Sequence, residues 1–305
     1  MYLNPIVKKD VKVQSRSMKI CWGVFAYELI LALVFFLAMV IIQNNSRYST
    51  SNIYSAIVWL YPILAVTQLV ILGLLVPIRT ASAISGEKER QTFDIMMTTS
   101  MSPFSVIMGK VMTAVVQSMF FVVASMPIMA LPFIIGGMSW GYLFLFLGIA
   151  LLVAFFSASI GILCSSLCKK SIGAVNLSYV FYLIFFLGTA IPPVVYSVVR
   201  ENMRYNLGHV PQVYEMFGPN TFLPLLLNPA IYLTEFFTDI MAGESLIENS
   251  FYDIRATTTR GPIKLVASGN WWMILSTALF IGVSLLFLWI ASRRIDPIKG
   301  RRKKR

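Results

Sequence analysis

Residues 141–167 read GYLFLFLGIALLVAFFSASIGILCSSL, a run without a single charged side chain. A helix that crosses a bilayer needs about 20 predominantly apolar residues. This run therefore predicts a transmembrane helix. The whole chain agrees, because 57% of its 305 residues are hydrophobic and its mean hydropathy is +0.75. So much apolar surface predicts that the lipid bilayer is the solvent for most of the protein.

Five further apolar runs are long enough to cross a membrane. They cover residues 21–42, 56–78, 104–135, 172–199 and 271–292. The chain is therefore predicted to be an all-α integral membrane protein with six transmembrane helices in residues 21–292. Pro192 and Pro193 lack amide donors and should kink or end the fifth helix.

The charges predict which way the helices run. With both termini in the cytoplasm, only six of the 25 Lys and Arg residues fall outside, as the positive-inside rule requires. Residues 1–20 are expected to form a cytoplasmic amphipathic helix on the membrane surface, with a disordered basic arm as the alternative. Residues 293–305 form a basic cytoplasmic tail.

The loop at 200–270 contains two apolar pieces that are each too short to cross a membrane. They lie in FGPNTFLPLLLNPAIYLTEFFTDIM (residues 217–241) and are separated at Asn228-Pro229. A single crossing by the whole stretch would put the basic C-terminal tail outside. We therefore expect short re-entrant or interfacial helices on the outer face.

No pattern of catalytic residues is found in the sequence. His209 is the only histidine, and the three cysteines cannot form a disulfide framework. A nucleotide-binding loop ending at Gly109-Lys110 would need glycine where Phe104 stands. We expect no catalytic, cofactor or metal site in this chain, so that any ATP chemistry belongs to a separate chain.

A few polar or small residues interrupt the apolar runs. Ser157, Gly161 and Ser165 recur every four residues, a spacing typical of close helix packing within the chain or between subunits. Glu28 could face the bundle interior or anchor its helix at the inner membrane surface; we favour the anchor. The candidates for a translocation path or a helix interface are Glu28, Gln68, Gln117, Asn176, Ser157, Gly161 and Ser165.

Charge is concentrated in residues 84–103, which read ISGEKERQTFDIMMTTSMSP. Ser85 is a candidate N-cap, and the apolar spacing that starts at Phe93 predicts a short helix over residues 85–101. Its mixed charge favours contact with a protein over contact with anionic lipid, because interfacial helices usually carry a cationic polar face. Ser102-Pro103 then starts the third transmembrane helix.

The stretch SGEKERQTFDIMMTTSMSPFSVIMGK resembles the signature that follows the second transmembrane helix in ABC-2 type transporter permeases. Similar support comes from NPIVKKD and SRSMK near the N-terminus and from SASIGILCSSLCKKSIGA. Gln91 replaces the usual Gly of the signature, and we expect a straighter helix there. The residues that match are Glu87, Glu89, Arg90, Thr92, Asp94, Pro103, Gly109 and Lys110.

The resemblance implies the transmembrane subunit of an ABC exporter, in a bacterial plasma membrane. Residues 85–101 would be the coupling helix, which docks into a cleft of a cytoplasmic ATPase. Two such ATPases would bind ATP and Mg, and a second permease copy would complete a homodimer or related heterodimer, surrounded by membrane lipids and without nucleic acid. The implied coupling residues are Glu87, Lys88, Glu89, Arg90, Thr92, Phe93, Asp94, Met96 and Met97.

Three other classes of function remain open from the residues alone. An integral membrane enzyme acting on lipid or peptide would need converging acids, His or Cys at membrane depth, and only Glu28 qualifies. An ion-coupled secondary transporter often shows inverted repeats and intramembrane carboxylates. The third class is a signalling or scaffold protein that works without an ATPase.

Overall fold

The structure is a computed structural model that describes residues 18–46, 58–93, 102–136, 139–209, 218–242 and 271–295. Within these residues the chain is helical and contains no strand. Six helices are long and apolar enough to cross a membrane, which confirms the predicted all-α fold. They span Ile20–Asn44, Leu60–Glu89, Pro103–Ala124, Gly141–Leu167, Ser171–Leu207 and Trp271–Ile295.

The chain forms two compact units, one of residues 1–178 with 283–305 and one of residues 179–282. Helices α9 (Ser171–Leu183) and α15 (Trp271–Ile295) each contribute residues to both units. The elements are α2 (Met18–Ser46), α4 (Leu60–Glu89), α6 (Pro103–Ala124), α7 (Met126–Gly136), α8 (Gly141–Leu167), α9 (Ser171–Leu183), η1 (Ile184–Gly188), α10 (Ile191–Leu207), η2 (Gly218–Leu227), α12 (Pro229–Ala242) and α15 (Trp271–Ile295).

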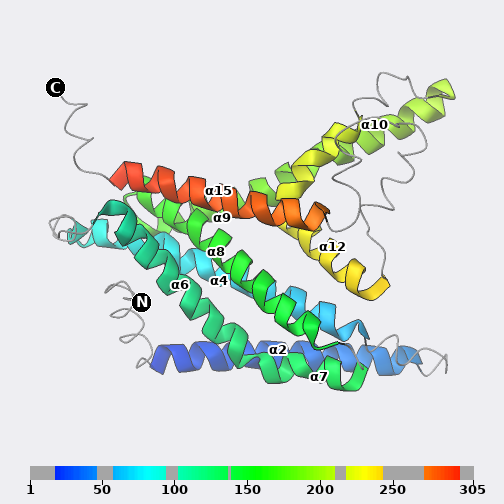
Figure 1. Cartoon of the computed structure of the whole chain (residues 1–305), viewed down its shortest axis with the longest axis horizontal. Helices are drawn as coiled ribbons and strands as arrows, with labels where there is room; N and C mark the ends of the chain where they lie inside the picture. Colours follow the sequence, from blue (N-terminus) through cyan, green and yellow to red (C-terminus); the bar gives the residue numbers. More distant parts are fainter. Residues whose placement is uncertain are drawn as a thin grey trace. The chain divides into compact units, whose positions relative to one another are not determined.

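In the first unit, α4 and α8 lie side by side and run parallel (Figure 1). Near their starts, the Tyr61 hydroxyl donates to the Tyr142 carbonyl at 3.1 Å. Between their ends, Gly161 lies so close to α4 that an added Cβ would be 1.9 Å from Thr80 Oγ1 and 2.9 Å from Thr80 Cβ. Only glycine permits this approach, which is the role expected of the small residue in the stripe.

α2 and α6 run antiparallel to α4. Near the start of α4, Leu60 packs with Ala38 of α2, and further along α4 Ile71 packs against a cluster that contains Tyr27 and Leu31 of α2. On α6, the early Lys110 pairs with Glu87, whereas the later Phe121 lies under Arg79. Successive long helices of this unit therefore alternate in direction, as a chain that crosses a membrane repeatedly requires.

The third apolar run is not one helix, because α6 ends at Ala124 and α7 begins at Met126. Pro127 explains the break, since it has no N–H to donate to the Val123 carbonyl. The predicted start of this run is confirmed: Ser102 has extended backbone angles, and its hydroxyl accepts from the Ser105 N–H at 3.3 Å, with Pro103 in the first turn.

In the second unit the interruption of the fifth helix lies just before the proline pair. The π-helical turn η1 ends at Gly188, and Pro192 and Pro193 occupy the first turn of a new helix. This helix, α10, continues to Leu207, so its last two turns occupy what was expected to be the start of the outer loop. Gly208, with φ of 71°, ends it in the left-handed conformation.

The predicted break at Asn228-Pro229 is confirmed, with η2 on one side and α12 on the other. Both the oxygen and the NH₂ group of the Asn228 side-chain amide form hydrogen bonds. Its oxygen accepts from the Ala230 N–H at 2.9 Å and so caps α12, while its NH₂ donates to Phe186 O and Thr189 Oγ1, both at 2.9 Å. Asn228 therefore ties the outer segment to η1; the position of this segment relative to the membrane stays a prediction.

Candidate functional site

Residues 85–89, expected to begin a separate helix, are the last turns of α4. The prediction that Ser85 is an N-cap is therefore wrong. Ser85 is fully buried, and its hydroxyl donates to the Ala81 carbonyl of the preceding turn at 2.6 Å. The apolar run ends near residue 78. The more polar residues after it remain part of the same helix because they contact α8.

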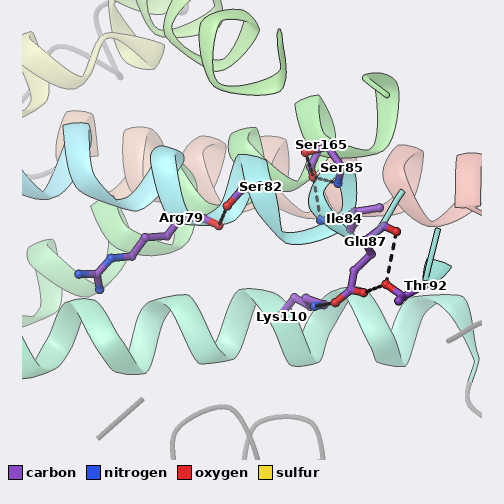
Figure 2. Close-up of polar contacts among 8 residues, drawn as sticks. All are labelled: Arg79, Ser82, Ile84, Ser85, Glu87, Thr92, Lys110 and Ser165. Carbon is purple, nitrogen blue, oxygen red and sulfur yellow. Dashed lines mark hydrogen bonds and ion pairs between the residues drawn. The ribbon is translucent and has the colours of Figure 1, made fainter. Parts of the chain in front are cut away.

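Ser165 of α8 provides one of these contacts. Its hydroxyl oxygen accepts from the backbone N–H groups of Ile84 and Ser85 at 2.9 and 2.8 Å (Figure 2). It also lies 3.4 Å from Ser85 Oγ, to which it can donate. All hydrogen-bonding capacity of this buried hydroxyl is thus used within the chain. In the stripe of Ser157, Gly161 and Ser165, the last two residues contact α4. This part of the stripe is therefore an interface within the chain.

Glu87 connects the end of α4 to α6. Its Oε1 lies 3.6 Å from Lys110 Nζ, and its Oε2 accepts a hydrogen bond from the Thr92 hydroxyl (Figure 2). Only 15% of the Lys110 side chain and 33% of the Glu87 side chain are exposed. An acid this close to the C-terminal end of a helix is unfavourable, and the Lys110 ammonium offsets that cost.

Lys88 connects the same end of α4 to the end of α8. Its ammonium donates to the Ser166 carbonyl at 2.7 Å, to Cys168 O at 3.3 Å and more weakly to Ser165 O at 3.5 Å. The last carbonyls of a helix have no partner within that helix, and they carry the negative end of its dipole. Lys88 is therefore a C-terminal cap of α8.

Glu89 connects α4 to the start of α9. Its two carboxylate oxygens accept from Ser171, one from the backbone N–H at 3.2 Å and the other from the hydroxyl at 2.6 Å. The N-terminus of a helix has free N–H groups and a positive partial charge, so a carboxylate is favoured there. Glu89 therefore holds the first turn of α9.

We call Glu87, Lys88 and Glu89, with their partners Lys110, Ser166 and Ser171, the α4-end junction. Consecutive residues of a helix point about 100° apart, so three adjacent side chains can reach three different neighbours. Here they reach α6, α8 and α9. The end of α4 therefore has polar contacts with three other helices.

α4 ends in a Schellman motif that the sequence did not reveal. Gln91 has φ of 58°, its N–H donates to the Lys88 carbonyl, and the Thr92 N–H donates to the Glu87 carbonyl at 3.0 Å. The expected straighter helix at Gln91 is therefore wrong. This position requires the left-handed conformation that Gly adopts most easily, which gives a physical reason for the usual Gly of the signature.

The other predicted coupling residues lie after the end of α4. Arg90 and Thr92 are exposed, as is Gln91 between them, and Phe93 is partly exposed. Lys88 Nζ lies 5.9 Å from the centre of the Phe93 ring. Asp94, Met96 and Met97 fall outside the described residues, as do residues 1–17 and 296–305, so the rest of the predicted coupling helix and both terminal segments stay predictions.

The polar residues proposed within the membrane do not form one group. Gln68 and Ser157 are completely buried and Gln117 is 6% exposed, whereas Asn176 lies exposed on α9. Among the described residues, neither amide atom of Gln68 has a hydrogen-bond partner. Glu28 is half-buried and its Oε1 is also buried without a partner there, so both the interior position and the anchor at the membrane surface stay predictions.

Sequence reasoning missed the partners of the α4-end junction. Lys110 matched the family signature but had no assigned contact, although an ammonium seven residues into an apolar helix is itself a sign of a nearby acid. Ser171 gave a similar signal, since Ser before a helical run is a typical cap. Neither signal identifies the acid that it meets.

Comparison with known proteins adds one match. The family described as ABC-2 family transporter protein matches residues 42–293. This range begins at the end of the first membrane-spanning helix and contains the next four completely, nearly all of the sixth, and the complete α4-end junction. No curated protein matches the chain.

Proposed function

The chain belongs to the ABC-2 family of transporter proteins, and we propose that it is the permease subunit of an ATP-driven exporter. In this proposal a separate cytoplasmic ATPase binds ATP and Mg, and the chain converts the ATPase's movement into substrate movement across the membrane. Two ATPases and two permease subunits make the transporter, with the termini of the permease in the cytoplasm. Export is favoured over import because the sequence has no feature that would dock an external binding protein.

The α4-end junction is the observation that carries this proposal. Glu87, Lys88 and Glu89 lie near the start of the segment that resembles a coupling helix, and they contact α6, α8 and α9. A push on this segment would therefore reach three membrane-spanning helices at once. Interfaces of packed helices respond to small local shifts by changing between discrete arrangements, which is what alternating access requires.

The proposal divides the predicted coupling residues into two groups. Glu87, Lys88 and Glu89 have partners within the chain, so they pass movement on. Arg90 and Phe93, which lie past the end of α4, would meet the ATPase together with the methionines that follow, since flexible Met side chains suit adaptable protein contacts.

The test uses the permease co-expressed with an ABC ATPase from the same genome. Phe93→Asp should abolish co-purification of the ATPase, because it places a charge in an apolar contact. Glu87→Gln with Glu89→Gln should retain the ATPase but lose the permease's effect on the rate of ATP hydrolysis. Ser82→Ala, on the exposed side of α4, is the control.

Two outcomes contradict the proposal. One is that the wild-type permease co-purifies with no ATPase. The other is that Phe93→Asp retains the ATPase while the Glu87 and Glu89 variant loses it, in protein whose helical content is unchanged.

A further inference from the structure

An exposed apolar face of α15 ends at a pair of arginines. Leu288 and Ala291 are buried. Leu286 and Trp289 lie on another side of the helix and are about half exposed. Arg293 follows on this second side, because residues three, four and seven positions apart are neighbours on a helix surface. Exposed apolar side chains of a membrane-spanning helix meet lipid acyl chains, so this face carries a cation where the apolar segment ends.

The Arg293 side chain lies against Trp289. Its guanidinium carbon is 3.7 Å from the centre of the Trp289 ring. This cation–π contact holds the charge beside the apolar face but uses no hydrogen-bond acceptor. Within the described part of the chain, the guanidinium groups of Arg293 and Arg294 form no ion pair or hydrogen bond. Each guanidinium has several N–H donors, so both remain able to bind an anion.

The C-terminal segment adds to this charge. Residues 293–305 contain eight Lys and Arg residues and a single acid, Asp296. A basic cluster of this size directly after a membrane-spanning helix attracts anionic lipid headgroups. A tryptophan at the end of such a helix is typical of the headgroup level. Charge and position together favour a lipid over a soluble protein as the partner of this surface.

We propose that the end of α15 binds an anionic phospholipid, with its phosphate at the two arginines and an acyl chain along Trp289 and Leu286. A guanidinium matches a phosphate with bidentate hydrogen bonds and keeps its charge. A zwitterionic lipid carries a cation beside its phosphate, so its attraction to the site is weaker. A free phosphate ion has no acyl chain and would not gain the apolar contact. The site depends on α15 and the membrane, not on coupling to ATP.

Trp289 makes the site observable, because brominated acyl chains quench the fluorescence of a tryptophan that they touch. The full-length permease is placed in phosphatidylcholine nanodiscs that contain a minor fraction of brominated phosphatidylglycerol or brominated phosphatidylcholine. The chain has six tryptophans, so the Trp289 signal is the difference between each protein and the same protein with Trp289→Phe. The association constant of phosphatidylglycerol should exceed that of phosphatidylcholine at least about fivefold, which corresponds to about 1 kcal/mol from one arginine near the headgroups.

The variants separate the helix end from the tail. Arg293→Gln combined with Arg294→Gln should reduce the preference to less than about twofold, whereas glutamine at all of residues 301–305 should leave at least about half of it. Arg204→Gln is the matched control and should retain the preference, since Arg204 is also an exposed arginine in the last turn of a membrane-spanning helix. Unchanged quenching by brominated phosphatidylcholine shows that a variant is folded and that Trp289 still contacts lipid.

Three results would overturn the proposal. Absent quenching of Trp289, or equal quenching by the two lipids, would show that no anionic lipid is selected here. A preference that survives the loss of both arginines would assign it to the tail. Inorganic phosphate that removes the preference at constant ionic strength would indicate a site for a simple anion.

Discussion

The Lys88 ammonium lies 2.7 Å from the carbonyl oxygen of Ser166 and so joins the end of α4 to the end of α8. The two helices also meet where Ser165 accepts two amide hydrogen bonds from α4 and where Gly161 lies against Thr80. These contacts make α4 and α8 a single structural element on which the chain after Glu89 can act.

Lys88→Met should destabilise the protein by about 1–3 kcal/mol. The methionine keeps the apolar stem of the side chain but leaves the last carbonyls of α8 without their charged donor. Denaturation in detergent, followed by helical content, measures the loss. Lys169→Met, which removes an exposed ammonium in the adjacent loop, should change stability by less than about 0.5 kcal/mol. Equal losses in the two variants would contradict the capping role.

Gly161→Ala should destabilise the protein by about 1–3 kcal/mol. The new methyl group would overlap Thr80, whose Cβ is close to the backbone and cannot move aside freely. The matched control is Gly148→Ala on the same helix, where nothing lies within 4 Å of the added Cβ and where alanine improves helix propensity. Thermal melting of the two variants in one detergent checks the prediction, which fails if both variants melt alike.

Gln91→Gly should stabilise the protein by about 1 kcal/mol. Gln91 adopts a left-handed conformation that costs a residue with a Cβ about 1–2 kcal/mol, and glycine removes most of that cost. Gln91→Ala is the control, because alanine retains the strain and removes only the exposed amide. A glycine variant that melts no higher than the alanine variant would show that the Schellman motif does not form at this position.

Asn228→Asp and Asn228→Ala should separate the two roles of the Asn228 amide. Aspartate keeps the oxygen that caps α12 but loses both donors to η1, whereas alanine loses both contacts. Hydrogen exchange should therefore increase at residues 186–190 in both variants and at residues 230–233 mainly in Asn228→Ala. Ser197→Ala, on the exposed face of α10, is the reference. Uniform protection in all variants would contradict these contacts.

The sequence was sufficient to predict the six membrane-spanning helices, because a bilayer requires long apolar runs that few other structures contain. It was also sufficient to predict the helix start at Ser102-Pro103 and the break at Asn228-Pro229. Each of these depends on residues close together in the chain.

The end of α4 was predicted wrongly for a physical reason. The fall in hydropathy after Ile78 marks a change of solvent, whereas the helix itself continues to Glu89 because Ser165 and Lys110 contact its last turns. These partners lie far away in the sequence. Ser85 has the composition of a cap but is held inside a helix, since tertiary contacts can override local preference.

The most direct test of the central claim, that the α4-end junction passes the movement of the ATPase to the membrane helices, is a charge exchange between Glu87 and Lys110. The reconstituted complex with its ATPase is measured for stimulation of ATP hydrolysis by the permease. Glu87→Lys and Lys110→Glu should each reduce this stimulation at least about fivefold without loss of bound ATPase, and the double variant should restore most of it. A double variant as impaired as the two single changes combined would contradict the claim.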